Sequence, residues 1–331
     1  MTYRKFITLV LFSFCLAGCG AYDGPVTSKT RLMMGTLVEI RAGGNVDTAI
    51  EKAFDEIARV EKVFSVYIPE SEVSRINSLR PGEKLRLTGE TFALIKKAVE
   101  YNKITDGAFD ITVKPLVDLW RRAKKDKRLP GDDEIRDALA VTGSDKIILD
   151  DSAKTISFAA EGMALDLGGI AKGYATDRAI AVLKANGVRN AIVNSGGDMY
   201  CLGRRSKDMM WKVGVKHPRD ENKLLFEMRL EDKAVDTSGD YEKYFLLGGK
   251  RYSHIIDPRT GYPVGDNAVS ATVVADDSAA ADIFATALCV LGDFKDIKDI
   301  DALVVVKDGD RLKIKMTEGF KSKYGLTEEK Y

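Results

Sequence analysis

The sequence of 331 residues is long enough to bury a substantial core as one large or two modest domains. Hydrophobic residues make up 45% of it and charged residues 31%, which is typical of a globular protein, and the formal net charge of +1 excludes a polycationic nucleic-acid-binding protein. Only two histidines are present, so a histidine-rich metal site is excluded, and any bound metal should be a hard cation with oxygen ligands.

The N-terminus has the features of a lipoprotein signal peptide. Two basic residues precede an apolar stretch at residues 6–14, which is shorter than the ~20 residues of a membrane span. The sequence Leu-Ala-Gly-Cys follows, ending at Cys19, and resembles a lipobox. We therefore expect residues 1–18 to be removed and Cys19 to be lipidated, so that the protein is anchored on the extracytoplasmic (periplasmic) side of a membrane. A plain secretory signal cut near Ala17 or Ala21 is the alternative.

A tether is expected at residues 19–31, followed by a folded domain at 32–331. Hydrophobic periodicity predicts the elements of its first half in chain order: a strand at 32–42, helices at 46–64, 89–103 (with Thr88 as the cap) and 132–140, and a hairpin with strands at 146–150 and 155–159. The basic run at 121–128 is interpreted as a solvated helix end or loop, because no aromatic residues are interleaved with it.

In the second half, strands outnumber helices. The pattern predicts helices at 170–185 and 278–291, and strands at 190–194, 211–216, 224–230, 243–247, 251–256 and 268–275, followed by a final hairpin that turns at Asp308 and Gly309. Because hairpins dominate, the sequence predicts an α+β fold with mixed or antiparallel sheets rather than a doubly wound fold. Two cysteines remain after the signal peptide and Cys19. Cys201 and Cys289 are expected to be buried free thiols, with a disulfide as the alternative.

The stretch ALDLGGIAKGYA at residues 164–175 combines charged residues with glycines, which have no side chain. Gly168 and Gly169 follow Asp166 at a predicted strand-to-helix junction, and Lys172 follows them. Glycines at such a junction let backbone amides approach an anion, which the helix N-terminus also favours. Neither a Rossmann nor a Walker A pattern is present. The alternative is a tight structural turn with Lys172 in solvent.

The predicted helix 278–291 places a carboxylate and a hydroxyl on one edge. Asp282 and Thr286 are four residues apart, and the residues around them are small. Such an edge suits a divalent cation that takes oxygen ligands. The alternative is an exposed face on which Asp282 interacts with the helix dipole.

Further polar groups occur next to predicted turns. His254 precedes a turn at Asp257 and Pro258, although a lone histidine is more often structural than catalytic. Ser238 lies in one of several loops rich in glycine and aspartate, and such loops could converge on a polar ligand.

Together these segments resemble the ApbE family, the FAD:protein FMN transferases, in the same order and over nearly all of the chain after the lipobox. The motifs that carry the resemblance are MGT (34–36), FSVY with SEVSRIN (64–77), GAFDITVKPL (107–116), ALDLGGIAKGYATD (164–177), NSGGD (194–198), TSGDYEKYF (237–245), HIIDPRTGYPV (254–264) and ADIFATALCVLG (281–292). Residue 283 is isoleucine where the family often has alanine, and this difference does not affect Asp282 or Thr286.

The resemblance implies a two-part α+β fold with FAD in a cleft between the parts. It also implies magnesium-dependent transfer of FMN from FAD onto a threonine hydroxyl of an acceptor flavoprotein, with release of AMP. The acceptor would carry a short threonine-containing motif and belong to a membrane redox complex. Carried over by motif, the magnesium ligands would be the backbone of Gly169 and the side chains of Asp282 and Thr286, and the catalytic residues would be His254 and Asp282. The FAD site would be formed by Met34, Tyr67, Ala108, Phe109, Asp110, Asp166, Lys172, Ser238 and Ile256.

This chemistry accounts for the residue types. The FAD pyrophosphate carries about two negative charges that repel an incoming oxygen, so magnesium and Lys172 would neutralise charge as the linkage breaks. Two other functions remain open from the residues: an FAD pyrophosphatase that yields FMN and AMP, and a lipoprotein that binds FAD without catalysis.

Overall fold

The computed structural model of the chain describes residues 26–265, 268–294, 297, 300–309 and 311–324. The predicted signal peptide and the lipidation site at Cys19 lie outside the described residues. Within the described ranges, no helix is both long enough and apolar enough to span a membrane.

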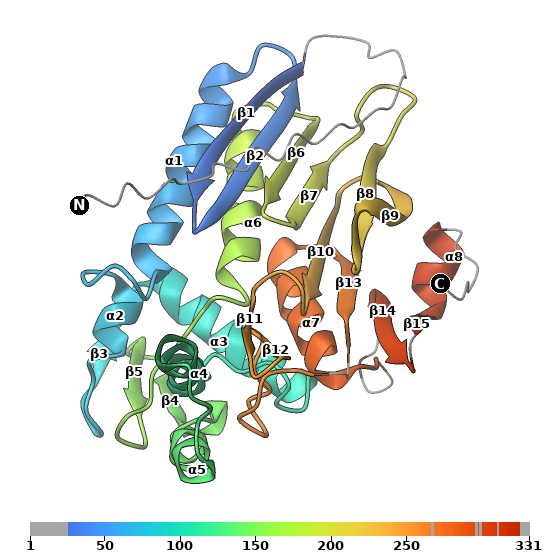
Figure 1. Cartoon of the computed structure of the whole chain (residues 1–331). Helices are drawn as coiled ribbons and strands as arrows, with labels where there is room; N and C mark the ends of the chain where they lie inside the picture. The colour runs from blue at the N-terminus through green and yellow to red at the C-terminus, as the bar shows by residue number, and fades with distance from the viewer. Residues whose placement is uncertain (1–25, 266–267, 295–296, 298–299, 310, 325–331) are drawn as a thin grey trace, which may run out of the picture.

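An eight-stranded sheet forms the centre of the molecule (Figure 1). All of its neighbouring strands pair antiparallel. In spatial order the strands are β1 (Val26–Met33), β2 (Thr36–Gly43), β6 (Ala191–Ser195), β7 (Asp198–Leu202), β10 (Lys233–Gly239), β13 (Ser270–Ala275), β14 (Asp301–Asp308) and β15 (Arg311–Met316). The predicted α+β fold with antiparallel sheets is therefore confirmed.

Alternation along each strand creates a separate core on each face of this sheet. On β14, Val304 and Val306 belong to the larger core, whereas Leu303 and Val305 belong to the smaller one. The larger core is shared with the helices α1 (Asp47–Phe64), α6 (Ala171–Ala185) and α7 (Ser278–Leu291), which pack together on that face (Figure 1). The smaller core is shared with the hairpin β8 (Trp211–His217) and β9 (Asp220–Leu230) and with α8 (Glu318–Tyr324).

A second group of elements lies beyond one end of the large sheet (Figure 1). It contains α2 (Glu72–Ile76), α3 (Gly89–Ile104), α4 (Lys114–Asp126), α5 (Asp132–Ala140), a 3₁₀ turn (Ser144–Lys146), and the small sheet of β3 (Leu85–Arg86), β5 (Thr155–Phe158) and β4 (Ile147–Asp150). The hairpin of β11 (Tyr244–Leu247) and β12 (Lys250–Ser253) joins this group through a third apolar cluster around Trp120.

Most predicted helices occupy their expected ranges. The cap of α3 is also confirmed, because the hydroxyl of Thr88 accepts a hydrogen bond from the backbone N–H of Thr91. The basic run 121–128 covers the C-terminal end of α4, a helix whose beginning the periodicity did not reveal. Cys201 and Cys289 are buried free thiols, as predicted.

The strand predicted at 32–42 is wrong in detail, because the chain reverses at Met34 and Gly35. Both residues have positive φ angles, 51° and 71°, and they join β1 to β2 as a two-residue hairpin loop. A methionine rarely adopts this conformation, which hides the turn from a propensity argument. Residues 26–31, expected to belong to the tether, therefore form most of β1.

Candidate functional site

Three carboxylates from three different elements meet between the large sheet and helices α6 and α7. Asp198 begins β7, Asp236 lies in β10, and Asp282 lies on α7. One ligand oxygen of each lies within 4.8 Å of the others, and all three side chains are buried. Oδ1 of Asp198 has no hydrogen-bond partner among the described residues. The three carboxylates therefore concentrate negative charge, and Oδ1 of Asp198 remains available as a ligand atom.

Local structure explains why these carboxylates converge. Asp236 and Ser238 alternate with residues of the opposite face on β10, so both point to the helix side of the sheet. Gly196 and Gly197 have positive φ angles and turn the chain directly before Asp198. The carboxylate of Asp277 caps α7 by accepting the N–H of Ala280, which fixes where that helix begins.

Lys172, in the first turn of α6, supplies the positive charge that faces this cluster. Its Nζ lies 2.5 Å from Oδ2 of Asp198 and 3.6 Å from Oδ1 of Asp282. Burial lowers the pKa of Lys172, but the carboxylates of Asp198, Asp282 and Asp236 outweigh this effect and raise its pKa above the ordinary value. Lys172 is therefore a charged group of the site, and the alternative of a solvated lysine is wrong.

The carboxylates are not fully compensated by this one ammonium. Burial and the charge of Asp198 raise the pKa of Asp282, while Lys172 lowers it. Burial, followed by the charges of Asp198 and Asp282, raises the pKa of Asp236 well above its ordinary value. Three buried carboxylates opposite one lysine are what a site for an additional cation requires.

Helix α6 packs unusually closely against α7 at this point. The N–H of Gly173 donates to Oδ2 of Asp282 at 3.2 Å. A Cβ on Gly173 would lie 2.3 Å from the carbonyl oxygen of Ser278, so only glycine allows this approach. The third glycine of the stretch 164–175 thus sets the position of Asp282 relative to Lys172.

The other two predicted metal ligands lie next to each other. A Cβ on Gly169 would lie 3.4 Å from Oγ1 of Thr286 and 3.2 Å from Cε2 of Phe109. Oγ1 of Thr286 is also 3.5 Å from Oγ of Ser238. The structure therefore brings together Gly169, Thr286, Ser238 and Phe109, residues widely separated in the sequence.

Asp166 shapes the glycine turn that precedes α6. Its Oδ1 accepts the N–H of Gly168 at 2.8 Å, and its own N–H donates to the carbonyl of Ile111 at 2.7 Å. The second bond ties the glycine turn to the loop that carries Ala108 and Phe109, both of which are buried.

Asp110 holds that same loop in place. Its buried carboxylate accepts five hydrogen bonds, from Asn102 and from both the backbone and the hydroxyl groups of Thr112 and Ser144. Its oxygens are thus engaged within the protein, which gives Asp110 a clear role in positioning Phe109. A direct contact between Asp110 and FAD stays a prediction.

The three remaining residues of the predicted FAD site lie in separate environments. Met34 occupies the β1–β2 turn. Thr36, which follows this turn, packs against Gly196, where a Cβ would collide with it. Tyr67 is 72% exposed, and its hydroxyl accepts a hydrogen bond from Arg121 at 2.7 Å. Ile256 is buried in the cluster around Trp120.

His254 follows β12 directly, and part of its surface is exposed although many protein atoms surround the ring. Its Nδ1 lies 2.9 Å from the carbonyl oxygen of Lys243, which can only accept, so Nδ1 carries the proton and Nε2 keeps its lone pair in the neutral ring. Desolvation by the surrounding protein, together with the charges of Lys243 and Lys172, lowers the pKa of His254 to about 4. The imidazole is therefore neutral at pH 7 and available to accept a proton.

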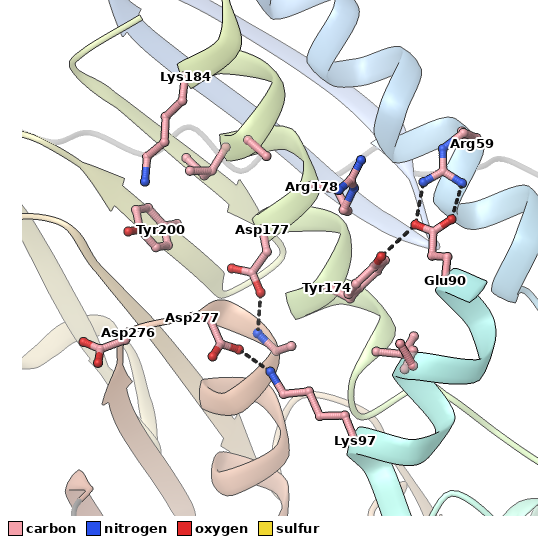
Figure 2. Close-up of a pocket in the computed structure, with 15 residues that line it drawn as sticks. Arg59, Glu90, Lys97, Tyr174, Asp177, Arg178, Lys184, Tyr200, Asp276 and Asp277 are labelled. Carbon is pink, nitrogen blue, oxygen red and sulfur yellow. Dashed lines mark hydrogen bonds and ion pairs between the residues drawn. The ribbon is translucent and has the colours of Figure 1, made fainter. Parts of the chain in front are cut away.

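An open groove of about 860 Å³ lies on the other side of α6 (Figure 2). Tyr174, Asp177 and Arg178 line it, and they lie opposite Lys172 around the helix. Many of its charges pair with one another: Glu90 binds Arg59 and Tyr174, Lys97 binds Asp277, and Asp177 accepts the N–H groups of Ser278 and Ala279. The groove is thus lined by residues of α1, α3, α6 and α7, and Asp198, Asp236 and Asp282 are not among them.

Asp198 and Asp236 were not among the predicted site residues. Asp198 ends the NSGGD motif, which contributed to the family resemblance but to which no role in the site was assigned. Asp236 lies in a strand whose alternate residues point into a hydrophobic core. A single acidic residue at such a position is the signal that could have identified it.

Comparisons with known proteins agree on one family. A model of the ApbE family matches residues 34–303. The FAD:protein FMN transferase of Klebsiella pneumoniae (strain 342) is 35% identical over 295 residues, which cover 87% of this chain and 92% of that protein. The FAD:protein FMN transferase of Vibrio cholerae (classical Ogawa 395) is 33% identical over 83% of this chain and 84% of its own length.

Solved structures agree with this result. The crystal structure of the ApbE protein from Thermotoga maritima has a TM-score of 0.82 and 35% identity, and the match covers 91% of this chain and 99% of that one. The flavin transferase ApbE from Vibrio cholerae also has a TM-score of 0.82, with 30% identity over 90% of this chain and 99% of its own.

Proposed function

This chain belongs to the ApbE family, and we propose that it transfers FMN from FAD onto a threonine hydroxyl of an acceptor flavoprotein, in a magnesium-dependent reaction that releases AMP. The protein is a transferase that moves flavin from FAD to a protein, as the names of relatives that match most of its length state. The observation that carries the finer proposal is the buried cluster of Asp198, Asp236 and Asp282 beside Lys172 and the glycine turn.

The donor set near Gly169 fits magnesium. Asp282 offers a carboxylate, Thr286 a hydroxyl and Gly169 its backbone carbonyl, and such hard oxygen ligands suit Mg²⁺. The excess of buried carboxylates over cations at the cluster also favours a dication. Bound there, Mg²⁺ would polarise the phosphate oxygens of FAD and neutralise charge as the pyrophosphate linkage breaks.

The chain's own groups would bind and orient FAD. Lys172 presents a fixed positive charge at the start of α6, where the helix dipole also favours an anion. Gly168 and Gly169 leave the main chain open to the pyrophosphate, since neither carries a side chain. Phe109 contacts the same turn and provides an apolar surface for the ligand.

His254 would activate the acceptor. A threonine hydroxyl is a weak nucleophile, and a positioned base typically accelerates such a step by about 10²–10⁴-fold. The hydroxyl proton passes to Nε2 of His254, and the threonine oxygen forms a new bond to the FMN phosphorus. The bond from that phosphorus to the bridging oxygen breaks, and AMP leaves with that oxygen.

The place of the reaction follows from the N-terminus. We propose that Cys19 carries a lipid, which would hold the enzyme at the extracytoplasmic face of a membrane, next to acceptors that belong to a membrane redox complex. The lipobox-like sequence supports this proposal.

One assay tests the function. The full-length protein is incubated with FAD and Mg²⁺, with and without the membrane and secreted proteins of its host, and flavin fluorescence is recorded on denatured proteins while AMP is measured in solution. We expect fluorescence on an acceptor and an equal amount of AMP, both lost with EDTA or with Asp282→Asn and retained with Asp276→Asn, which changes an exposed carboxylate that pairs with Lys233. Free FMN made equally fast without acceptor would identify a pyrophosphatase instead, and intact FAD would identify a carrier.

A further inference from the structure

Asp177 is an acidic residue near the site that the proposed reaction does not use. It lies on α6, on the side of the helix opposite Lys172, and lines the open groove. Figure 2 shows its carboxylate directed at the start of α7. Oδ1 of Asp177 accepts the N–H of Ser278 at 2.7 Å, and Oδ2 accepts the N–H of Ala279 at 3.0 Å. One carboxylate of α6 therefore holds two main-chain groups of α7.

These bonds complete the N-terminal cap of α7 from another helix. The first N–H groups of a helix have no acceptor within that helix. On α7, the N–H of Ala280 is bonded by Asp277, the residue before the helix. The N–H groups of Ser278 and Ala279 are both bonded by Asp177. The start of α7 is thus tied to α6 as well as to its own preceding residue.

A second tie between the two helices lies about one turn away. Gly173 lies four residues before Asp177 on α6, and its N–H donates to Oδ2 of Asp282. On α7, Asp282 lies three residues after Ala279. Four helical residues span ~6 Å and three span ~4.5 Å, so the two ties are separated along both helix axes. Two separated ties restrict the rotation of one helix against the other, which a single tie does not.

The environment of Asp177 opposes its negative charge. Burial raises the pKa of this carboxyl to about 6, even though its two hydrogen bonds lower the pKa. Among the nearby charges, that of Asp277 raises the pKa and that of Lys97 lowers it. Asparagine would avoid the cost of burying a charge, but its NH₂ group would face one of the two N–H donors. The two bonds to α7 therefore explain why a carboxylate occupies this position.

We propose that Asp177 is a positioning residue of the transferase, which holds the start of α7 against α6 so that Asp282 is placed to bind the dication beside Lys172. This inference rests on the proposed function. It adds a residue that acts on metal affinity through the arrangement of two helices, from the side of α6 that faces away from the site.

Titration of the full-length protein with MgCl₂ tests the inference directly. Isothermal titration calorimetry near neutral pH gives the Kd for Mg²⁺ of the wild type and of Asp177→Asn. The variant keeps the shape of the side chain but loses one of its two acceptor oxygens. We expect the Kd to rise about 5- to 20-fold, because α7 would then hold Asp282 in the binding arrangement for only about 5–20% of the time.

Flavin transfer to host proteins separates positioning from stability. At saturating FAD, the Mg²⁺ concentration that gives half the maximal rate should rise by the same factor in Asp177→Asn. The rate at saturating Mg²⁺ should stay within about threefold of the wild type, because bound Mg²⁺ favours the arrangement that binds it. A purely structural role would lower Tm and the amount of active protein but would leave both constants for Mg²⁺ unchanged.

Two further variants complete the test. Asp177→Ser, which has a smaller side chain, should raise the Kd for Mg²⁺ at least as much as Asp177→Asn. Asp277→Asn is the matched control for charge, because it removes one carboxylate from the same groove and leaves both bonds of Asp177 in place. Asparagine also caps helices well, so the N–H of Ala280 keeps an acceptor. The Kd of this control should stay within about twofold of the wild type.

Each remaining outcome has a distinct meaning. An equal rise of the Kd in Asp177→Asn and Asp277→Asn would show that lost charge alone weakens Mg²⁺ binding, and would overturn the proposal. An unchanged Kd in Asp177→Asn and Asp177→Ser would also overturn it, even where the wild type transfers flavin. A wild type that binds Mg²⁺ but transfers no flavin would contradict the proposed function, while the titration still tests Asp177. A wild type that neither binds Mg²⁺ nor depends on it for transfer would contradict the metal site and this inference together.

Discussion

The backbone N–H of Gly173 donates a hydrogen bond to Oδ2 of Asp282 at 3.2 Å, across the contact between α6 and α7. The residue before Gly173 is Lys172, whose Nζ faces the same carboxylate at 3.6 Å. One turn of α6 therefore holds the carboxylate that we propose as a metal ligand and presents the cation that we expect to face the FAD phosphates. The geometry of the site depends on how closely these two helices approach.

Gly173→Ala should disrupt the site by forcing the helices apart. The new Cβ would lie 2.3 Å from a backbone oxygen of α7, which cannot rotate away as a side chain could. Overpacking of this kind typically costs about 1–3 kcal/mol. Chemical denaturation should show that loss, together with a fall in kcat/KM for FAD. Gly89→Ala is the control, because a Cβ there meets nothing within 4 Å, and it should leave both quantities unchanged.

Asp177 should give the protein a measurable pH dependence of stability. Burial raises the pKa of this carboxyl from 3.8 to about 6, against the effect of its hydrogen bonds from Ser278 and Ala279. The folded state thus holds the proton more tightly than the unfolded chain, and this contribution is fully present below pH 4 and lost as pH rises through about 6. Asp177→Asn removes it.

The free energy of unfolding of the wild type, measured relative to that of Asp177→Asn, should therefore fall by on the order of 2 kcal/mol between pH 4 and pH 7. Urea denaturation at several pH values measures this difference. Parallel profiles for the two proteins would show that Asp177 ionises normally in the folded state.

Asp236→Asn should stabilise the metal-free protein and weaken its binding of Mg²⁺. Without metal, burial and the charges of Asp198 and Asp282 oppose ionisation of Asp236, so replacing its carboxyl with an amide removes that cost. In EDTA the variant should melt a few degrees higher than the wild type. Added Mg²⁺ should stabilise the wild type more than the variant, because ligand binding to the folded state alone raises Tm. An equal response of both proteins to Mg²⁺ would place the metal away from Asp236.

His254→Ala should lower kcat by about 10²–10⁴-fold, as expected for loss of a general base. The Kd for FAD should change less than twofold, because the imidazole would act on the acceptor hydroxyl. Since its pKa is lowered to about 4, protonation of His254 should lower the wild-type rate only as pH drops through that value. The control is His217→Ala, whose Nδ1 accepts the N–H of Arg219 and which should retain full activity.

Local patterns in the sequence predicted α1, α3, α5, α6 and α7, but not α2, α8 or the beginning of α4. The spacing of Asp282 and Thr286 placed both on one edge of α7, and the paired glycines marked the turn before α6. These predictions succeeded because each depends on residues within one or two turns of the chain.

Other parts depend on contacts between distant segments, which one sequence does not display. Asp198 and Asp236 join Asp282 only because β7 and β10 are neighbours in the sheet. The turn at Met34 could not be predicted from the sequence, because a non-glycine residue takes a positive φ angle there. Helix α7 is almost wholly buried, so its small residues reflect close packing as well as the site.

Intact-mass spectrometry of the labelled acceptor tests most directly whether the site built around Asp282 and Thr286 transfers FMN to a hydroxyl. We predict an increase equal to one FMN less one water, located on a single threonine, dependent on Mg²⁺ and abolished by Asp282→Asn and by Thr286→Val. Full labelling by both variants, or a flavin that leaves the acceptor on denaturation, would contradict the account.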